Sequence, residues 1–365
     1  MTEVKYWIWL SSLVKINPHK RYELLEYYKD PAYIWHESEE VLRKLPFIDN
    51  ADVEHIINKQ SRNCTQKILE RLAEMDVNVI TIQDNLYPED LKNIYDPPTV
   101  LYVKGKLIRN EPGIAIVGSR RATSYGLDTA ENLAAELSKY GLTIVSGMAR
   151  GIDSKGHNGA LAAGGRTIAV LGCGIDIVYP SENKELMKRI CSNGAVISEY
   201  LPGTPPTAFN FPVRNRIISG ISLGIAVIEA NEKSGSLITA NYALEQGKEV
   251  FAIPGNIDSI NSTGTNRLIR DGAKIVLELG DILDELKISH SANNSFCKKN
   301  KVMNTAGLDD DEKTIVKKLE KGSEHIDAIA RACDLSIHST GSILVMLEMK
   351  GFVEQMPGKS YRLVK

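Results

Sequence analysis

The chain has 365 residues, 43% of them hydrophobic and 25% charged, which predicts a soluble protein of two or three domains. Its net charge of −2 excludes a globally basic nucleic-acid-binding protein, so any such contact must come from a local cluster of Arg and Lys. The 5 cysteines are scattered and form no C-x-x-C pair, which predicts a reducing compartment without a disulfide framework or zinc site. We therefore expect a cytoplasmic protein that has no metal, cofactor or membrane-spanning segment.

Residues 1–83 predict a small all-helical N-terminal domain, similar to SAM and helix-hairpin-helix domains. Apolar residues recur at helical spacing, as in Ile68, Leu69 and Leu72. The turn at 44–49 is placed like the DNA-contacting turn of a helix-hairpin-helix, but it has no glycine for close approach to a phosphate. A packing or partner-binding role is therefore favoured. A polar connector and an edge strand follow over 84–112.

Residues 113–286 alternate between short apolar strands and helical stretches. This pattern predicts an α/β domain, an extended Rossmann-like doubly wound parallel sheet with helices on both faces. Strands are expected at 114–117, 142–145, 167–171, 195–197, 224–229, 249–253 and 273–277.

The loops after these strands are unusually rich in glycine and serine. They cover 118–121, 146–153, 172–176, 229–236 and 254–256. For each loop alone, a tight turn is the favoured interpretation, but five such loops at the carboxyl edge of one sheet predict a surface that approaches a ligand closely. Arg120 and Lys155 lie among these loops without matching catalytic acids, which favours a phosphate-bearing ligand.

The stretch 200–216 predicts a long proline-rich loop that precedes a helix over 217–222. It brings Phe209 and Phe211 next to Arg214 and Arg216, a combination of aromatic faces and cations that single-stranded nucleic acid uses. The alternative for one phenylalanine is that its ring fills the core.

Catalytic motifs are missing from the sequence, and we predict no catalytic residue. Asp153 is placed to cap a helix over 154–162. His157 lies in the same helix, and its position fits a general base. A lone histidine at such a position more commonly makes a structural hydrogen bond, which is the favoured interpretation.

The C-terminal part predicts a linker over 287–308 and a winged-helix domain over 309–365. Helices are expected at 309–319, 326–333 and 339–350, followed by a hairpin over 352–364. The third helix has an apolar stripe and only one late lysine, which favours protein contact or packing over reading of DNA.

Seven motifs in order across about half of the chain closely resemble the DNA-processing protein A (DprA/Smf) family. They lie at 117–121, 146–157, 174–180, 211–220, 234–240, 243–247 and 254–255. The departures are small, since Met148 and Gly156 stand where Leu and Ala are more usual and neither removes a donor.

The resemblance implies a non-enzymatic cytoplasmic protein that binds single-stranded DNA and loads the recombinase RecA onto it. It also implies displacement of single-strand-binding protein, a role in natural transformation and a homodimer formed through the Rossmann-like domain. The DNA-binding residues that we expect are Gly118, Ser119, Arg120, Gly147, Lys155, Phe211, Arg214, Asn215, Arg216, Ser234 and Gly235.

Two other functions remain open at this point. One is a nucleotide-processing enzyme of the lysine-decarboxylase-like type, a nucleoside monophosphate hydrolase, which would need Glu229 or Asp153 for catalysis. The chain lacks the Pro-Gly-Gly-x-Gly-Thr loop of those enzymes. The other is a transcription regulator that binds duplex DNA through its winged helix.

Overall fold

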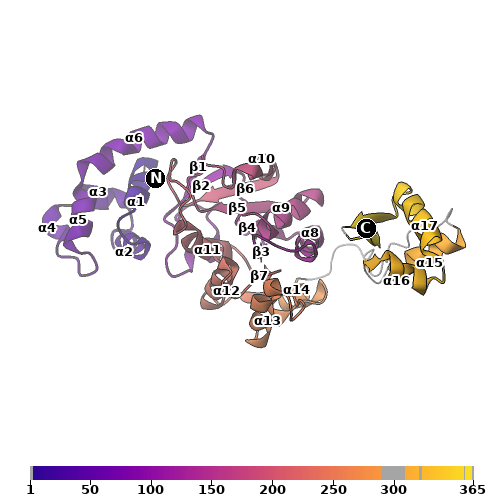
Figure 1. The fold of residues 1–365 in the computed structure, drawn as a ribbon. Coiled ribbons are helices and arrows are strands. Elements are labelled where there is room, and N and C mark those ends of the chain that lie inside the picture. Colours follow the sequence, from indigo (N-terminus) through magenta and orange to yellow (C-terminus); the bar gives the residue numbers. More distant parts are fainter. Residues whose placement is uncertain (1–2, 289–308, 320–322, 357, 364–365) are drawn as a thin grey trace. The chain divides into compact units, whose positions relative to one another are not determined.

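The computed structural model describes residues 3–288, 309–319, 323–356 and 358–363 (Figure 1). The chain forms two compact units, one within Met1–Ala292 and the other within Asn293–Lys365. Beyond 288, the predicted linker at 287–308 lies outside the described residues. Among the described residues, no helix is both long and apolar enough to cross a membrane.

A nine-stranded sheet forms the centre of the first unit, in the order β1-β2-β6-β5-β4-β3-β7-β8-β9. Its strands are β1 (Asn78–Thr81), β2 (Val100–Gly105), β3 (Gly113–Val117), β4 (Thr143–Ser146), β5 (Thr167–Leu171), β6 (Gly194–Ser198), β7 (Gly224–Val227), β8 (Glu249–Ala252) and β9 (Lys274–Ile275). From β6 to β9 all neighbours pair in parallel, whereas β2 pairs antiparallel with β6 and β1 antiparallel with β2. The predicted doubly wound α/β sheet is thus confirmed, with two antiparallel strands added at one edge.

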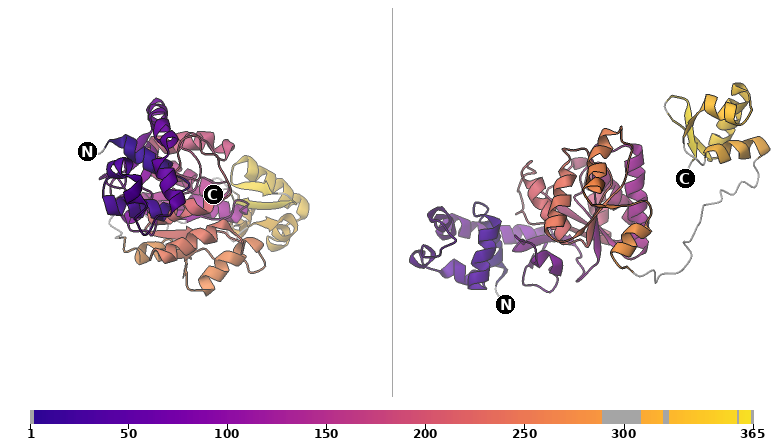
Figure 2. Two further views of the ribbon diagram at one scale, coloured as in Figure 1. Left: turned by 90° about the vertical axis from the view of Figure 1, so that its left-hand side faces the viewer. Right: turned by 90° about the horizontal axis from the view of Figure 1, so that it is seen from below.

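Helices cover both faces of this sheet (Figures 1 and 2). They are α8 (Ser124–Lys139), α9 (Ile152–Ala162), α10 (Lys184–Asn193), α11 (Asn210–Gly220), α12 (Gly235–Glu245), α13 (Thr263–Arg270) and α14 (Gly280–Glu285), with short 3₁₀ turns at Ser181–Asn183 and Ile260–Ser262. Alternate residues of β3 belong to two separate cores, with Ile114 and Ile116 in one and Ala115 and Val117 in the other. A strand buried on both faces has no polar side to alternate with, which explains its continuous apolar run.

The chain reverses its direction across the sheet between β3 and β7. From β3 it proceeds through β4, β5 and β6 toward one edge, then returns to β7 on the other side of β3 and continues to β9. In open α/β sheets, ligands bind beyond the carboxyl ends of the strands near such a reversal. The loops after β3, β4, β5 and β7 therefore surround the expected binding region.

The N-terminal helices lie beside the β1 edge of the sheet (Figure 1). They are α1 (Val4–Ser12), α2 (Pro18–Tyr28), α3 (Pro31–His36), α4 (Glu39–Leu42), α5 (Asn50–Ile57) and α6 (Lys59–Glu74), and α7 (Glu89–Lys92) follows β1. Their core is continuous with one core of the sheet, and the hydroxyls of Ser11 and Tyr102 share a buried hydrogen bond of 2.7 Å. The domain limits at 83 and 113 stay predictions.

One part of the helical prediction is wrong, because residues 78–81 form β1 and pair with β2. The short apolar run around Val79 and Ile80 fits a strand as well as a helix.

The second unit has the winged-helix fold. Its elements are α15 (Asp310–Leu319), β10 (Glu324–His325), α16 (Ile326–Ala332), α17 (Ile337–Met349), β11 (Val353–Met356) and β12 (Ser360–Leu363). The strands are ordered β10-β12-β11, and Ile315, Ile329 and Leu344 form part of the unit's own buried core. The predicted hairpin is present as β11 and β12, while Pro357 in its turn lies outside the described residues.

Candidate nucleic-acid interface

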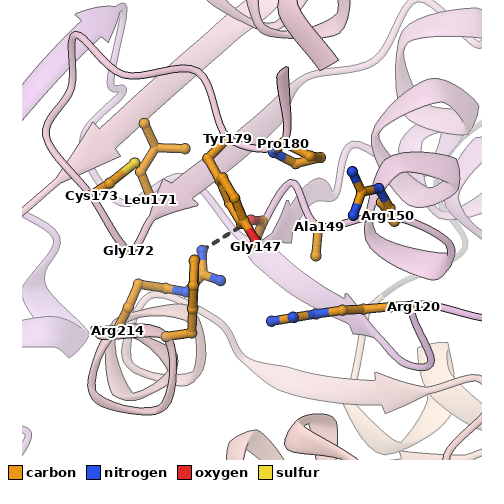
Figure 3. Close-up of a pocket in the computed structure, with 11 residues that line it drawn as sticks. Arg120, Gly147, Ala149, Arg150, Leu171, Gly172, Cys173, Tyr179, Pro180 and Arg214 are labelled. Carbon is orange, nitrogen blue, oxygen red and sulfur yellow. Dashed lines mark hydrogen bonds between the residues drawn. The ribbon is translucent and has the colours of Figure 1, made fainter. Parts of the chain in front are cut away.

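Three strand-end loops and the start of α11 meet in a pocket at the carboxyl edge of the sheet (Figure 3). The pocket is lined by Arg120 after β3, by Gly147, Ala149 and Arg150 after β4, by Leu171, Gly172, Cys173, Tyr179 and Pro180 at the end of β5 and after it, and by Phe211 and Arg214 in α11. Among these, the sequence had indicated Arg120, Gly147, Phe211 and Arg214.

Two aromatic rings and one exposed arginine form the wall of this pocket. The rings of Tyr179 and Phe211 are stacked, with centroids 5.3 Å apart and an interplanar angle of 29°. The guanidinium carbon of Arg120 lies 5.4 Å from the centroid of Phe211, within the range of a cation–π contact. The pocket therefore combines flat apolar faces with an accessible positive charge.

Arg214 supports the pocket from beneath rather than from its surface. It is buried, its Nη1 donates to the carbonyl of Gly147 at 3.0 Å and also to that of Val170, and its guanidinium lies 5.9 Å from the Phe211 ring. Burial lowers the pKa of Arg214, and the nearby carboxylate of Asp153 opposes that shift. The side chain ties β4 and β5 to α11 and has few donors left for a ligand.

Two glycines allow this close packing. A Cβ atom on Gly147 would lie 2.6 Å from Nη2 of Arg214, and one on Gly172 would lie 2.7 Å from Cδ1 of Phe211. Neither site has room for a side chain unless the pocket wall moves.

The loop after β3 holds Arg120 between fixed backbone contacts. Ser119 is buried, its amide donates to the carbonyl of Glu229 at 2.7 Å, and its hydroxyl accepts a hydrogen bond from the amide of Arg121 at 3.1 Å. A Cβ atom on Gly118 would lie 2.9 Å from the carbonyl oxygen of Glu229. The loop is thus fixed from below, and the side chain of Arg120 remains exposed at its tip.

The predicted loop at 200–216 is partly a helix, because α11 already begins at Asn210. Pro212 lies in its first turn, where the missing N–H group costs no helical hydrogen bond. Phe209 lies just before the helix and is 78% exposed, whereas Phe211 is half-buried in the pocket wall. Further along the helix, the polar residues Arg214, Asn215 and Arg216 are all buried.

Arg216 lies in a separate, buried ion-pair cluster. Only 2% of it is exposed. Its two terminal nitrogens donate to Glu199 at 3.0 and 2.7 Å, and its Nε donates to Asp96 at 2.8 Å. Burial would lower its pKa, but the two carboxylates outweigh burial and raise the pKa above its usual range. The structure therefore places Arg216 away from the pocket.

The other predicted DNA contacts lie outside the pocket lining. Lys155 on α9 pairs with Glu131 at 2.6 Å. Asn215 is buried, accepts a hydrogen bond from Nε of Arg214 at 3.3 Å and donates to the carbonyl of Gly235 at 3.3 Å. Ser234 caps α12, its hydroxyl accepting from the amide of Ser236 at 3.4 Å. Asn215 thus links the pocket to the start of α12.

Tyr179 is the residue that sequence reasoning missed. It precedes Pro180 and lies within the motif at 174–180, but the expected DNA-binding residues do not include it. A signal was nevertheless present, since an aromatic residue followed a glycine-rich strand end.

The acids that an enzymatic mechanism would use make structural bonds. The carboxylate of Glu229 accepts hydrogen bonds from the amide of Thr123 at 2.9 Å and from its hydroxyl. Asp153 lies inside α9 rather than at its cap, which is Gly151, and its carboxylate accepts from the amide of Ala149 at 3.3 Å. Burial raises the pKa of Asp153, and Arg214 opposes that shift. Among the described residues, no group of three or more His, Cys, Asp or Glu side chains could hold a metal ion.

His157 is fully buried and neutral. The hydroxyl of Thr167 donates to the carbonyl of Ile144, so it accepts the proton on Nδ1 of His157 across 2.6 Å. Nε2 is buried and has no hydrogen-bond partner within the protein. Burial, together with the charge of Arg214, lowers the pKa of His157 to about 3.

This buried histidine predicts a stability that falls in acid. The unfolded chain binds a proton at His157 below about pH 6.5 whereas the folded chain does not until about pH 3, so stability decreases between these values by up to about 1.4 kcal/mol per pH unit. We expect His157→Asn to reduce the slope of the unfolding free energy against pH, measured by urea unfolding, by the equivalent of about one proton. This holds even if the change lowers stability at pH 7. If the variant and the unchanged protein have the same slope between pH 6 and pH 4, then His157 binds its proton in the folded chain as readily as in the unfolded chain, which would contradict the prediction.

Comparisons with known proteins give a consistent result. The family described as DNA recombination-mediator protein A matches residues 78–287, and the DprA winged helix domain matches residues 299–359. Protein Smf of Synechocystis is 32% identical over 99% of both chains. DNA processing protein DprA of Bacillus subtilis is 44% identical over 60% of this chain and 75% of its own length.

Two solved structures extend the comparison. DNA processing protein A from Streptococcus pneumoniae has a TM-score of 0.63 and 37% identity, and the match covers 78% of this chain and 99% of that one. DNA processing protein A from Helicobacter pylori, whose structure is described as giving insight into a single-stranded DNA binding mode, has a TM-score of 0.52 and 31% identity over 57% and 96% of the two chains.

Proposed function

This chain belongs to the DNA recombination-mediator protein A (DprA/Smf) family, and we propose that it binds single-stranded DNA in the pocket beside Arg120 and passes the strand to a recombinase. Its role in DNA processing and recombination follows from the family. The strand, the contact residues and the recombinase are the parts that we propose.

The observation that carries the proposal is the exposed Arg120 beside the stacked rings of Tyr179 and Phe211. A single strand offers phosphates and unpaired base faces together, and it binds where cations and aromatic rings alternate. In a duplex the base faces are stacked on one another and cannot reach such rings. The pocket therefore favours a single strand over a duplex.

Within the predicted set, we assign direct contact to Arg120 and Phe211, and we assign Gly118 and Ser119 to holding the loop that carries Arg120. Arg214 and Asn215 position the pocket wall, and Gly147 gives Arg214 its space. Lys155, Ser234 and Gly235 lie along the further course of the strand in our proposal. We leave Arg216 out, because its donors are used by Glu199 and Asp96.

Changing Phe211 tests the aromatic part of this proposal. We expect Phe211→Leu, which keeps apolar bulk but removes the ring, to weaken binding of a single-stranded oligonucleotide by about 1–3 kcal/mol, or roughly 5- to 150-fold. The salt dependence should not change, because no charge is lost. Titration of equal-length single- and double-stranded oligonucleotides across a salt series measures both quantities. Equal affinity of the unchanged protein for the two DNAs would contradict the proposed function.

We also infer that the protein acts by binding rather than by catalysis. This is supported by the structural bonds of Glu229, Asp153 and His157, the three side chains that the hydrolase alternative or general-base chemistry would need. Incubation with nucleoside monophosphates should release neither base nor phosphate. Release that is lost on changing Glu229 or Asp153 would establish the enzyme instead.

The proposal has four further parts. They are RecA as the recombinase, displacement of single-strand-binding protein, a homodimer and a cytoplasmic location. Two exposed apolar side chains support a homodimer formed by side-chain contacts of the Rossmann-like domain, since Ile275 in β9 is 38% and Leu277 beyond it 75% exposed. Light scattering measures the dimer. RecA-dependent ATP hydrolysis on DNA coated with single-strand-binding protein should rise when the protein is added, and no rise would contradict the loading step.

A further inference from the structure

Asp176 follows β5 in the loop that carries Tyr179, and its carboxylate bonds two other parts of the chain. Oδ1 accepts a hydrogen bond from the amide of Gly203 at 2.9 Å, and Oδ2 accepts one from Nη2 of Arg71 at 2.6 Å. Arg71 lies in the last turn of α6, among the N-terminal helices. The carboxylate therefore joins three segments that are far apart in the sequence, and neither it nor its two partners line the pocket.

The two loops that Asp176 joins are the ones that hold the stacked rings. Tyr179 lies in the loop after β5, and the loop after β6 leads into α11 and to Phe211. A second bond between the same loops runs from the amide of Gly174 to the carbonyl of Thr204 at 2.9 Å. These bonds fix one loop against the other, and they therefore contribute to the position of one ring against the other.

Arg71 is the counter-charge of a carboxylate that has little access to water. The side chain of Asp176 is 11% exposed, whereas that of Arg71 is 53% exposed. Among the ion pairs of the described residues, Asp176 has no other cation. A carboxylate in such a position is costly without a partner, so loss of Arg71 favours conformations in which Asp176 turns toward water and releases the amide of Gly203.

We propose that Asp176 is a positioning residue for the DNA pocket, and that Arg71 gives the N-terminal helical domain control over it. When the ion pair is closed, the two loops hold Tyr179 against Phe211 in the arrangement on which a base stacks. When it is open, the rings separate more readily and the affinity for DNA falls. The inference rests on the proposed function, and it adds the N-terminal domain as a regulator of the same site.

Changing Asp176 to asparagine distinguishes positioning from simple attraction of DNA. Asp176→Asn keeps an acceptor for the amide of Gly203 but breaks the ion pair. Attraction alone predicts tighter binding of single-stranded DNA by this variant, because a negative charge is lost. Positioning predicts weaker binding, by about two- to fivefold, because a partly exposed ion pair stabilises the closed arrangement by about that factor.

Changing Arg71 to alanine is expected to give the same loss from the other side of the ion pair. The slope of log affinity against log salt should not change, because Arg71 holds Asp176 and not a phosphate. Arg71→Lys, which can still form the pair, should bind nearly as well as the unchanged protein. Lys67 lies exposed one turn earlier in α6, and Lys67→Ala is the matched control that should leave the affinity unchanged. Fluorescence anisotropy with a single-stranded oligonucleotide measures these affinities.

The variant Phe211→Leu provides a background that separates positioning from general destabilisation. In this background, Arg71→Ala and Asp176→Asn should have no further effect on the affinity, since the stacked pair of rings that they position is gone. A change that only loosens the fold lowers the affinity equally in both backgrounds. Equal losses in the two backgrounds, or tighter binding by Asp176→Asn, would overturn the inference.

Hydrogen exchange without DNA tests the role of Asp176 independently of the proposed function. In Arg71→Ala, the amides of 172–180 and 199–209 should exchange faster than in the unchanged protein, whereas those of β3 and β4 should not change. Unchanged exchange in the two loops would overturn the inference, whatever the affinities are. Faster exchange in a protein that does not bind single-stranded DNA would contradict the proposed function, but it would support Asp176 and Arg71 as the pair that holds the two loops together.

Discussion

Replacing Arg120 by alanine is expected to lower the affinity for single-stranded DNA about 10- to 100-fold, the effect of losing one charge-assisted hydrogen bond to a phosphate. Arg120 is the exposed cation of the pocket that makes a cation–π contact with Phe211, so its removal also weakens the aromatic wall. The slope of log affinity against log salt should become shallower by about 0.7, the value for one phosphate contact on a single strand. Fluorescence anisotropy at several salt concentrations measures both changes.

Arg150 provides the matched control for Arg120. It lines the same pocket and is also exposed, but its guanidinium is bound to both oxygens of Glu182. Arg150→Ala should therefore change the affinity and the salt slope much less. Neither change should move the unfolding temperature, because exposed ion pairs contribute only about 0–1 kcal/mol. Equal losses in the two variants would assign the effect of Arg120 to general charge instead of to a phosphate contact.

Replacing Arg216 by alanine is expected to destabilise the first unit by up to about 3–5 kcal/mol, because the change leaves two partly buried carboxylates without the buried arginine that bonds them. Glu199 and Asp96 are the carboxylates concerned, and both are bonded only to Arg216 among the ion pairs described. Urea unfolding followed by tryptophan fluorescence measures the loss. Changing Glu199 to Gln in the same chain should restore part of it, since one of the uncompensated charges is then removed.

The same variant separates a structural role from a DNA contact. If Arg216 acts as the structure indicates, Arg216→Ala that remains folded at low temperature binds single-stranded DNA nearly as well as the unchanged protein. Weaker binding with unchanged stability would return Arg216 to the set of DNA contacts and contradict its placement in the buried cluster.

The sheet and its binding edge could be predicted from the sequence because their signals are local. A parallel strand covered on both faces is apolar at every position, as in β3, and a loop that begins with a glycine and a serine directly follows it. Since parallel strands place their carboxyl ends at one edge, loops far apart in sequence could be grouped without a structure. This grouping indicated Arg120 and Gly147 for the pocket that they line.

The roles of the arginines in α11 could not be predicted, because they depend on distant partners. Asp96 lies 120 residues from Arg216, and the Gly147 carbonyl lies 67 residues from Arg214. In the sequence, both arginines look like exposed donors beside an aromatic residue. The start of α11 could not be predicted from the proline-rich stretch either, because Pro212 is compatible with the first turn of a helix as well as with a loop.

The two antiparallel strands at one side of the sheet have a consequence for the behaviour of the protein at high concentration. Without β2, the five-residue strand β6 would end the sheet with a row of unpaired amides and carbonyls, which is a template for aggregation. With β1 and β2 in place, the outermost strand on that side has four residues, and on the other side β9 has two. Short outer strands offer little length for another chain to pair with. The residues before Gly113 thus protect the binding domain against fibrous association as well as extending its core.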